Sequence, residues 1–307
     1  MRAAQILDLG GAPSVADVPE PEPGERELVE VLAVALNPLD LAVAAGRFYG
    51  GHPPLPYVPG SEAVARTQEG KRVYAFGDGL GVARDGTLAE RATIAGERLV
   101  PIEEEVDDAT AVALGIAGII GWSAIERGRV GPGDRVLVLG ASGTTGLIAI
   151  QRAKQRGPDR IVAAGRDLER LERARELGAD ETVTLSGDLR AACGGDGPTV
   201  VIDPLWGEPV AAAVEAAAPR ARIVNFGQSA GAEATLKSGT VRSKELELLG
   251  LTNFARTAEE LRTIHGELLA AARSGALRVD FETFSLDDVD EAWRRQGAGA
   301  KTVVARS

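Results

Sequence analysis

Three regularly spaced glycines, Gly140, Gly143 and Gly146, lie in the segment RVLVLGASGTTGLIAIQRAK, residues 135–154. They separate a short β-branched apolar run from a segment whose apolar residues recur at helical spacing. Glycine allows a sharp turn, omits the Cβ that would block a pyrophosphate and lets the helix pack closely on the strand, while free N–H groups at the helix N-terminus face the anion. The segment predicts a dinucleotide-phosphate site formed by Gly140, Ser142, Gly143, Thr144, Thr145 and Gly146.

The glycine spacing taken alone has a second interpretation. It is G-x-x-G-x-x-G, one residue longer than the usual G-x-G-x-x-G fingerprint, and ordinary strand-to-helix loops also contain glycines. The surrounding sequence favours nucleotide binding, because a second β-type run at 160–164 and an amphipathic segment at 168–178 follow at the distances of a βαβ unit.

The end of the second β-type run indicates which nicotinamide cofactor is bound. NAD-preferring chains place Asp or Glu there, about 20 residues after the glycine turn, whereas this chain has Gly165 and Arg166. A glycine leaves room for the 2′-phosphate, and a guanidinium can bind it through charge-assisted hydrogen bonds. We therefore predict NADP(H), with Arg170 as a second cation and Asp167 as a helix cap. The alternative is that Arg166 is an ordinary solvated charge.

The composition limits the class of protein. The 307 residues, 44% of them hydrophobic, are enough for two domains with sizeable cores. A net charge of −11 argues against nucleic acid or an anionic membrane as the main partner. The first residues lack the apolar run of a secretory signal, and Cys193, the single cysteine, excludes an internal disulfide, so we expect a cytoplasmic protein.

The run from Ala109 to Ile125 contains no charged residue. A membrane span would need about 20 apolar residues, and this shorter run is interrupted by Gly115, Gly118 and Gly121. We interpret it as a buried helix at a domain junction.

Three blocks of sequence predict the architecture. Residues 1 to about 112 contain short β-type runs separated by Gly and Pro, which predicts an antiparallel, loop-rich unit. From about 113 to 254, β-type runs alternate with helical segments, which predicts an α/β domain with a doubly wound parallel sheet. The remainder contains a helix at about 257–274, a strand near Phe281, a helix that begins near Asp287 and a final strand KTVVA, and it could return to complete the first block.

A glycine turn near position 140 and the absence of Tyr-x-x-x-Lys disfavour the short-chain dehydrogenases. The whole chain instead resembles the medium-chain dehydrogenase/reductase superfamily, in its zinc-free quinone oxidoreductase branch. The resemblance is carried by ALNPLDLAVAAGRF (35–48), LPYVPGSEA (55–63), GTLAERATI (86–94), LGIAGIIGWSAI (114–125), GDRVLVLGASGTTG (133–146) and ARELGAD (174–180). It implies a GroES-like partial barrel built from residues 1–112 and 255–307, a Rossmann domain at 113–254, an active site in the cleft between them, and a homodimer.

A count of possible ligands argues against a catalytic zinc, which needs about three Cys, His or carboxylate ligands. Cys193, His52 and His265 cannot supply them. The resemblance places Asn37 where the zinc branch has its first cysteine ligand and Ser61 where it has histidine. We expect no metal. Without a Lewis acid, hydride addition to a conjugated system is easier to support than alcohol oxidation.

The resulting hypothesis is that NADPH delivers hydride to a small-molecule quinone or to the β-carbon of an α,β-unsaturated carbonyl. The charge that develops on the substrate oxygen needs hydrogen-bond donors. By family position, Asn37 contacts the substrate or the nicotinamide ribose, and Tyr49 and Tyr57 are possible hydroxyl donors. Alternatively, Asn37 holds a turn and Tyr57 only packs among prolines. The nicotinamide is expected at the carboxyl ends of the parallel strands, near Pro204, Leu205, Phe226, Gly227, Asn253 and Phe254.

Three other motifs are interpreted as structural. His52, beside prolines, is an exposed loop residue, and Cys193 has no activating partner in its local sequence. The segment GAGAKT at 297–302 is similar to part of a P-loop, but too few residues follow it for a helix, so we predict a final strand.

Two other functions remain open at this level. The chain could be an enoyl-thioester or alkenal reductase, or a catalytically idle NADPH-binding sensor of the same fold.

Overall fold

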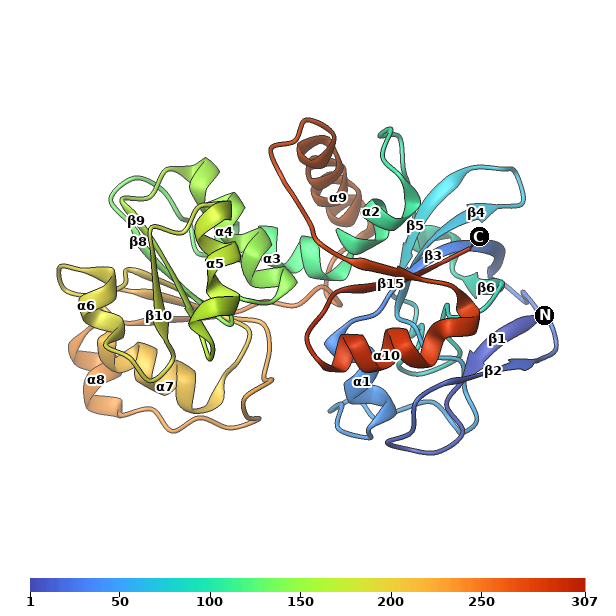
Figure 1. The fold of residues 1–307 in the computed structure, drawn as a ribbon, viewed down its shortest axis with the longest axis horizontal. Helices are drawn as coiled ribbons and strands as arrows, with labels where there is room; N and C mark the ends of the chain where they lie inside the picture. Colours follow the sequence, from blue (N-terminus) through green and yellow to red (C-terminus); the bar gives the residue numbers. More distant parts are fainter. Residues whose placement is uncertain (307) are drawn as a thin grey trace. The chain divides into compact units, whose positions relative to one another are not determined.

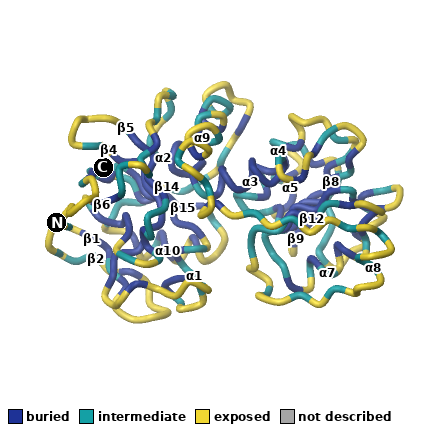
Figure 2. The backbone as a smooth tube through the Cα atoms, turned by 180° about the vertical axis from the view of Figure 1, so that it is seen from behind, coloured by how far each residue is buried: buried dark blue, intermediate teal, exposed yellow. Residues whose placement is uncertain are grey.

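The computed structural model describes residues 1–306 and divides the chain into two compact units. The first unit contains Met1–Ile119 and the chain from Phe254 onward, and the second contains Ile120–Asn253. The predicted first boundary, at residue 112, lies before the observed division, and the predicted second boundary lies within one residue of it. Each unit has its own sheet (Figure 1), and the buried segments follow the strands of each sheet (Figure 2).

The second unit is built on a parallel six-stranded sheet, as predicted, in the order β10-β9-β8-β11-β12-β13. The strands are β8 (Arg135–Leu139), β9 (Arg160–Gly165), β10 (Glu181–Thr184), β11 (Val200–Asp203), β12 (Arg222–Asn225) and β13 (Glu247–Gly250). The strand order reverses between β8 and β11. Doubly wound sheets bind ligands outside the carboxyl ends of the strands at such a switch point.

Helices cover both faces of this sheet. They are α3 (Ile116–Arg127), α4 (Thr144–Arg156), α5 (Leu168–Leu177), α6 (Leu189–Cys193), α7 (Gly207–Ala216) and α8 (Ser238–Ser243). Strand β8 is buried on both sides, because Val136 and Val138 pack with α3, α4 and α5, whereas Leu137 and Leu139 pack with α6 and α7. An apolar run without polar alternation is typical of such a central parallel strand.

The first unit contains a seven-stranded sheet whose main order is β14-β15-β3-β4-β5-β7, with β6 paired to β3. Its strands are β3 (Glu27–Ala35), β4 (Glu62–Thr67), β5 (Arg72–Phe76), β6 (Arg91–Ile94), β7 (Leu99–Pro101), β14 (Glu282–Phe284) and β15 (Thr302–Ala305), and β1 (Arg2–Gln5) and β2 (Ser14–Asp17) form a separate hairpin. The C-terminal segment completes this unit, because β15 pairs antiparallel with β3 in the register Val304 to Val34. The segment GAGAKT therefore leads into a strand, as predicted.

The helices of the first unit are α1 (Pro38–Ala44), α2 (Asp108–Ala113), α9 (Ala258–Arg273) and α10 (Val289–Gly297), with short 3₁₀ turns η1 (Gly96–Arg98) and η2 (Leu286–Asp288). Helix α9 begins with a capping box between Thr257 and Glu260. Such a box satisfies two backbone N–H groups that the first helical turn leaves without partners.

The prediction of a single helix across 109–125 is wrong, because the run is divided into α2 and α3 around Gly115. A Cβ at Gly115 would lie 2.0 Å from Glu62 Oε2. The same carboxylate oxygen accepts a hydrogen bond from the backbone N–H of Ile116 at 2.6 Å, so Glu62 caps the start of α3. Within residues 1–306, every helix is too short or too polar to cross a bilayer.

Candidate functional site: a glycine turn and a buried polar cluster

The glycine turn after β8 has the backbone geometry that its sequence predicts. Gly140 has φ +61°, a conformation that L side chains rarely adopt. Gly143 is the N-cap of α4, and no side chain of residues 1–306 caps this helix. The first N–H groups of α4, from Thr144 onward, have no partner one turn earlier, and the helix dipole places positive charge there. This terminus can therefore bind an anion.

Gly146 keeps the helix close to the turn. A Cβ at Gly146 would lie 2.8 Å from both Ala141 Cα and Gly140 O. Both of these are backbone atoms, so a side chain could not be accommodated by a rotamer change. Together with the first N–H groups of α4, this close approach forms a backbone cradle that fits a diphosphate.

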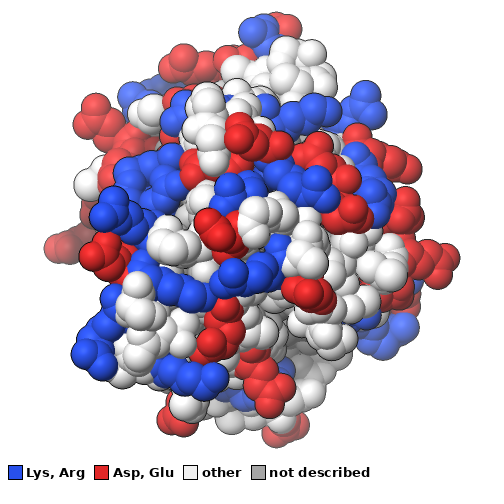
Figure 3. Space-filling model, turned by 90° about the vertical axis from the view of Figure 1, so that its left-hand side faces the viewer, with Lys and Arg blue, Asp and Glu red and all other residues white. Residues whose placement is uncertain are grey.

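At the end of β9, Gly165 lies close to α5. A Cβ added at Gly165 would lie 3.0 Å from Leu171 Cδ2. Arg166 and Arg170 are exposed, and neither has an ion-pair or hydrogen-bond partner within residues 1–306. Asp167 caps α5, as predicted, by accepting a hydrogen bond from Glu169 N at 2.9 Å. Elsewhere, Figure 3 shows Lys and Arg interleaved with Asp and Glu on the face that it draws.

The loops after β11 and β12 lie together beside the glycine turn. A Cβ at Gly140 would lie 3.2 Å from Pro204 Cγ and from Leu205 Cδ2. A Cβ at Gly227, which follows Phe226, would lie 2.4 Å from Pro204 O. The structure thus brings together five of the predicted cofactor residues: Gly140, Pro204, Leu205, Phe226 and Gly227.

Buried Asp203 organises these two loops. Its Oδ1 accepts hydrogen bonds from Leu205 N and Trp206 N, each at 2.9 Å, and its Oδ2 accepts one from Asn225 Nδ2 at 2.8 Å. Burial raises the pKa of Asp203, while these hydrogen bonds oppose the shift. Trp206 has φ +56°, so these contacts hold a backbone conformation that is unfavourable for a non-glycine residue.

The last two predicted cofactor residues fall on opposite sides of the division between units. Asn253 is buried and ends the second unit. Phe254 begins the first unit, where its ring centroid lies 6.2 Å from that of Phe48 and 5.7 Å from that of Phe76.

The first unit contains a buried polar cluster around Lys301, which we call the Lys301 cluster. Its members are Asn37, Asp40, Ser61, Glu62, Tyr74 and Lys301, and all are almost fully inaccessible to solvent. Lys301 Nζ donates to Leu36 O at 3.0 Å and to Asn37 Oδ1 at 2.9 Å, and it lies 3.9 Å from Glu62 Oε1. Asn37 Nδ2 donates to Ala35 O at 3.1 Å and to Glu62 Oε1 at 2.7 Å.

The two carboxylates of the cluster have different partners. Glu62 Oε2 accepts hydrogen bonds from Tyr74 O–H at 2.8 Å and from Ile116 N. Asp40 accepts one from Asn37 N at 2.7 Å and is hydrogen-bonded to Ser61 Oγ. Burial raises the pKa of both carboxyls, and burial lowers the pKa of Lys301, while the attraction between the opposite charges opposes each shift.

The two candidate tyrosines differ sharply in environment. Tyr57 is 1% exposed, and its hydroxyl has no hydrogen-bond partner within residues 1–306. Burial, with a contribution from the Asp40 carboxylate, raises the pKa of Tyr57 to about 12. Tyr49 is 80% exposed, and its ring centroid lies 4.4 Å from that of Phe48. A buried hydroxyl without a partner can donate to a ligand that reaches it.

The sequence prediction named Asn37 but missed Lys301, Glu62 and Asp40 as its partners. Glu62 and Lys301 lie in the segments PGSEA and GAGAKT, yet neither segment indicates that the two charges meet. A charged residue within an apolar strand-like run is the only local signal.

The remaining histidine and cysteine residues have structural surroundings. His52 is exposed, as predicted. His265 Nε2 is hydrogen-bonded to Ala111 O at 2.9 Å, and burial lowers the pKa of His265 to about 4. Burial raises the pKa of Cys193 to about 12. In the described part of the chain, His, Cys, Asp and Glu side chains form no group of three or more suited to a metal ion.

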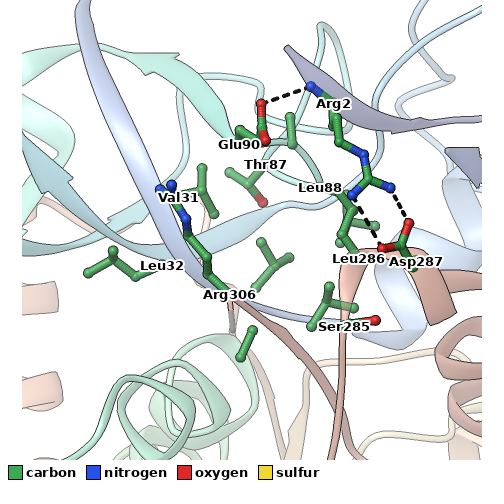
Figure 4. Close-up of a pocket in the computed structure, with 14 residues that line it drawn as sticks. Arg2, Val31, Leu32, Thr87, Leu88, Glu90, Ser285, Leu286, Asp287 and Arg306 are labelled. Atoms are coloured by element: carbon green, nitrogen blue, oxygen red, sulfur yellow. Dashed lines mark hydrogen bonds and ion pairs between the residues drawn. The ribbon is translucent and has the colours of Figure 1, made fainter. Parts of the chain in front are cut away.

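A separate surface pocket of about 140 Å³ lies in the first unit (Figure 4). Arg2 donates a hydrogen bond through its backbone N to Glu90 Oε2 at 2.9 Å and forms an ion pair with Asp287. None of the predicted site residues lines this pocket. The pocket therefore does not support the predicted hydride-transfer site, and its residue Arg2 is already paired with Asp287 and Glu90.

Comparisons with known proteins agree with this architecture. The family model described as "Zinc-binding dehydrogenase" matches residues 144–269. The chain is 30% identical to "Quinone oxidoreductase-like protein 2" of Mus musculus, over 81% of this chain and 74% of that protein. The structure matches that of a quinone oxidoreductase from Thermus thermophilus, which was also solved with NADPH, with a TM-score of 0.84 and 28% identity over all of both chains.

One relative is much longer than this chain. A phenolphthiocerol/phthiocerol polyketide synthase of Mycobacterium tuberculosis contains a region that is 29% identical over 91% of this chain, and the match covers only 13% of that protein.

Proposed function

Because the chain belongs to the medium-chain dehydrogenase/reductase superfamily, in its quinone oxidoreductase branch, we propose that it is an NADPH-dependent oxidoreductase that reduces a quinone or the β-carbon of an α,β-unsaturated carbonyl. The observation that carries the proposal is the backbone cradle formed by Gly140, Gly146 and the uncapped start of α4. The relatives named quinone oxidoreductases support the choice of acceptor.

Each part of the cofactor has residues suited to it. NADPH supplies hydride when it is bound. The glycine turn and the first N–H groups of α4 bind the diphosphate. Arg166 and Arg170 bind the 2′-phosphate, since both side chains are exposed and neither forms an ion pair with a carboxylate of residues 1–306. Pro204, Leu205, Phe226, Gly227, Asn253 and Phe254 surround the nicotinamide.

Tyr57 stabilises the substrate oxygen in this proposal. Its buried hydroxyl has no partner within residues 1–306, which destabilises the free protein and leaves the hydroxyl available to an acceptor. A tyrosine hydroxyl is protonated at neutral pH, and burial raises the pKa of Tyr57 further, so it donates a hydrogen bond to the oxygen on which charge develops. Tyr49, on the surface, contributes aromatic contact and a second hydroxyl.

We also propose that the reaction proceeds without zinc. Asn37 and Ser61, which stand at two ligand positions of the zinc branch, carry an amide and a hydroxyl, neither of which is a usual zinc ligand. Both side chains are hydrogen-bonded within the Lys301 cluster. Tyr57 then takes the role that a Lewis acid would have at the substrate oxygen.

The test is NADPH oxidation by the purified protein with a panel of quinones and enones, with and without a chelator. We expect turnover with at least one member of the panel and equal rates in both conditions. Loss of activity on chelation would contradict the zinc-free mechanism. Tight NADPH binding without oxidation of any acceptor would support the alternative of a catalytically idle sensor.

A second candidate that we propose is an enoyl-thioester or alkenal reductase, and the relative of Arabidopsis thaliana named "NADPH-dependent alkenal/one oxidoreductase", which is 32% identical over 59% of this chain, supports the alkenal class. Enoyl thioesters and alkenals therefore belong in the same panel. A kcat/KM for an enoyl thioester well above that for every quinone would replace the quinone assignment.

We further propose a cytoplasmic homodimer. Strand β13 is an edge of the six-stranded sheet, and Leu248 on it is 46% exposed. An edge strand with an exposed apolar residue can pair with a second copy. The molar mass measured by light scattering should be that of a dimer for the wild type and that of a monomer for Leu248→Lys. A wild-type monomer would contradict the proposal.

A further inference from the structure

Four aromatic rings of the first unit follow one another, and we call them the aromatic row. The order is Tyr49, Phe48, Phe254 and Phe76, and the centroids of neighbouring rings lie 4.4, 6.2 and 5.7 Å apart. Tyr49 is 80% exposed and Phe254 is 40% exposed. An apolar or aromatic ligand can therefore reach the row and pack against it.

A half-buried arginine lies beside the aromatic row. Arg256 follows Phe254 by two residues, so their Cα atoms lie within about 7 Å of each other. Its Nε is buried and has no hydrogen-bond partner, and its side chain forms no ion pair within residues 1–306. A guanidinium has five N–H donors and no acceptor, and carboxylate and phosphate are the groups that match it. The partner that Arg256 lacks is therefore an anion.

A second arginine holds the backbone of Arg256. Arg98 Nη1 donates a hydrogen bond to Arg256 O at 2.9 Å, and Arg98 forms no ion pair within residues 1–306. Its guanidinium lies along Gly77, where an added Cβ would be 3.6 Å from Arg98 Nε and 3.7 Å from Cζ. Gly77 directly follows Phe76, so this second positive charge also lies next to the aromatic row.

The neighbouring carboxylates have other partners. Asp78 Oδ2 accepts hydrogen bonds from Arg26 Nε at 2.6 Å and from Arg84 Nη2 at 2.7 Å. Burial lowers the pKa of Arg256, and the charge of Glu260 opposes this shift, but the Glu260 carboxylate is held in the capping box of α9. Within the described part of the chain, neither carboxylate forms an ion pair with the two arginines beside the row.

From this geometry we infer that Arg256 binds an anionic group of the acceptor, a carboxylate or a phosphate, while the aromatic row binds the apolar part of the same molecule. Arg98 positions the Arg256 backbone and adds a second positive charge. The preferred acceptor is thus an enone or quinone that carries an acidic group. That the ligand is an acceptor rests on the proposed function, whereas the binding of an apolar anion does not.

Binding is tested first with ligands that cannot be reduced. The anions 3-phenylpropionate and 2-phenylethyl phosphate and the neutral 3-phenylpropan-1-ol share an aromatic ring and differ in charge. Calorimetric titration of the wild type should give a lower Kd for at least one anion than for the alcohol. The anion that binds more tightly assigns the group as a carboxylate or a phosphate.

Two substitutions then test Arg256. In Arg256→Met, the Kd of the tighter anion should rise about tenfold, which corresponds to about 1.4 kcal/mol. Arg256→Lys keeps the charge but loses the planar fork of donors, so its Kd should lie between those of the wild type and Arg256→Met. Because the Arg256 side chain has no hydrogen-bond partner within residues 1–306, Arg256→Met should melt no lower than the wild type.

The matched control is Arg242→Met, which changes the net charge by the same amount. Arg242 lies on α8 in the second unit, is exposed and forms no ion pair within residues 1–306. Its loss should leave the Kd of both anions at the wild-type value.

Turnover is tested with trans-3-benzoylacrylate and its methyl ester, two enones that differ in charge. The ester is intrinsically the more electrophilic, so the readout is how the ratio of kcat/KM, acid over ester, changes between proteins. This ratio should fall about tenfold in Arg256→Met and stay at the wild-type value in Arg242→Met.

Equal Kd values for the anions and the alcohol in the wild type would overturn the inference. So would an unchanged Kd in folded Arg256→Met, or an equal loss in Arg242→Met. If Arg256→Met does not fold, Arg256→Gln, which keeps a polar side chain without charge, takes its place with the same expected loss. A wild type that binds the anions through Arg256 but reduces neither enone would refute the proposed function and confirm the anion site.

Discussion

The glycine turn of the second unit uses backbone atoms of residues 140–146, whereas the Lys301 cluster of the first unit joins side chains from Asn37 to Lys301. In the turn, the missing Cβ atoms create the space and the helix start supplies the positive charge. In the cluster, charged and amide side chains are hydrogen-bonded to one another. Lys301 and Glu62 each bind one end of the Asn37 amide and so fix its orientation. The turn can therefore be recognised from a short stretch of sequence, and the cluster cannot.

The two regions also differ in what they leave free. Within residues 1–306 no side chain caps the first N–H groups of α4, whereas the side chains of the Lys301 cluster are hydrogen-bonded to one another. Beside the cluster, Tyr57 has a hydroxyl without a partner within residues 1–306, although Asp40 is close enough to affect its pKa. In the proposed function, this hydroxyl without a partner within residues 1–306 is what separates Tyr57 from the satisfied side chains of the Lys301 cluster.

The substitution Tyr57→Phe tests this distinction most strongly. Loss of the donor should lower kcat/KM for a quinone by about 100- to 1,000-fold. The free energy of unfolding should rise by about 1–3 kcal/mol, because an unsatisfied buried hydroxyl is removed. Steady-state kinetics and urea denaturation measure the two effects.

Tyr74→Phe is the matched control for the stability effect. It removes a hydroxyl that donates to Glu62 at 2.8 Å, so the free energy of unfolding should fall. If Tyr57→Phe retains wild-type kcat/KM, Tyr57 is only a packing residue.

A second substitution tests the cradle of the second unit. Gly146→Val places carbon atoms against Ala141 Cα and Gly140 O and should raise the Kd of NADPH about 100-fold, an estimate for a displaced phosphate-binding helix start. Equilibrium titration by fluorescence measures this change.

Gly131→Ala is the control in the same unit, since nothing lies within 4 Å of its Cβ position. We expect its NADPH affinity to equal that of the wild type. Equal affinities for Gly146→Val and Gly131→Ala would show that the turn is not the phosphate site.

Acid should act on the first unit through His265. The pKa of this buried histidine is lowered from 6.5 to about 4, so the unfolded chain binds a proton at higher pH than the folded chain does. Stability is therefore complete above pH 6.5 and is lost as the pH falls toward 4, by about 2–3 kcal/mol at pH 4.5. Urea denaturation at several pH values measures the loss.

In His265→Gln this pH-dependent loss should be absent over the same range, although other groups still titrate. His265 lies in the first unit, so hydrogen exchange at pH 5 should show faster opening there than in the second unit. A wild type and variant with parallel pH profiles would contradict the role of His265.

The smallest expected effect concerns the choice of cofactor. Arg166→Ala should weaken NADPH binding by about 10- to 150-fold, since charge-assisted hydrogen bonds contribute about 1.5–3 kcal/mol. NADH, which lacks the 2′-phosphate, should bind as it does to the wild type. Equal losses for the two cofactors would remove the assignment of Arg166.

Much of the second unit could be predicted from the sequence because its elements are local and repetitive. The predicted β-type run RVLVL became β8 with the same bounds, and the glycine turn, the cap at Asp167 and the helix at 168–177 followed from residues next to one another. By contrast, the run at 109–125 was predicted as one helix. Its division depends on Glu62, which lies 54 residues before Ile116, and no pattern within the run indicates that contact.

The sequence by itself determined the parallel, doubly wound fold and the place of its glycine turn, since glycine spacing, strand runs and helix starts act over a few residues through the backbone. Only the tertiary structure decided that Lys301 reaches Asn37, that Glu62 orients the amide, and that the Tyr57 hydroxyl is left without a partner within residues 1–306. Those contacts depend on the pairing of β15 with β3 and on burial, which sets the strength of each charge and hydrogen bond. Neither the strand pairing nor the burial can be predicted from the residues next to one position in the sequence.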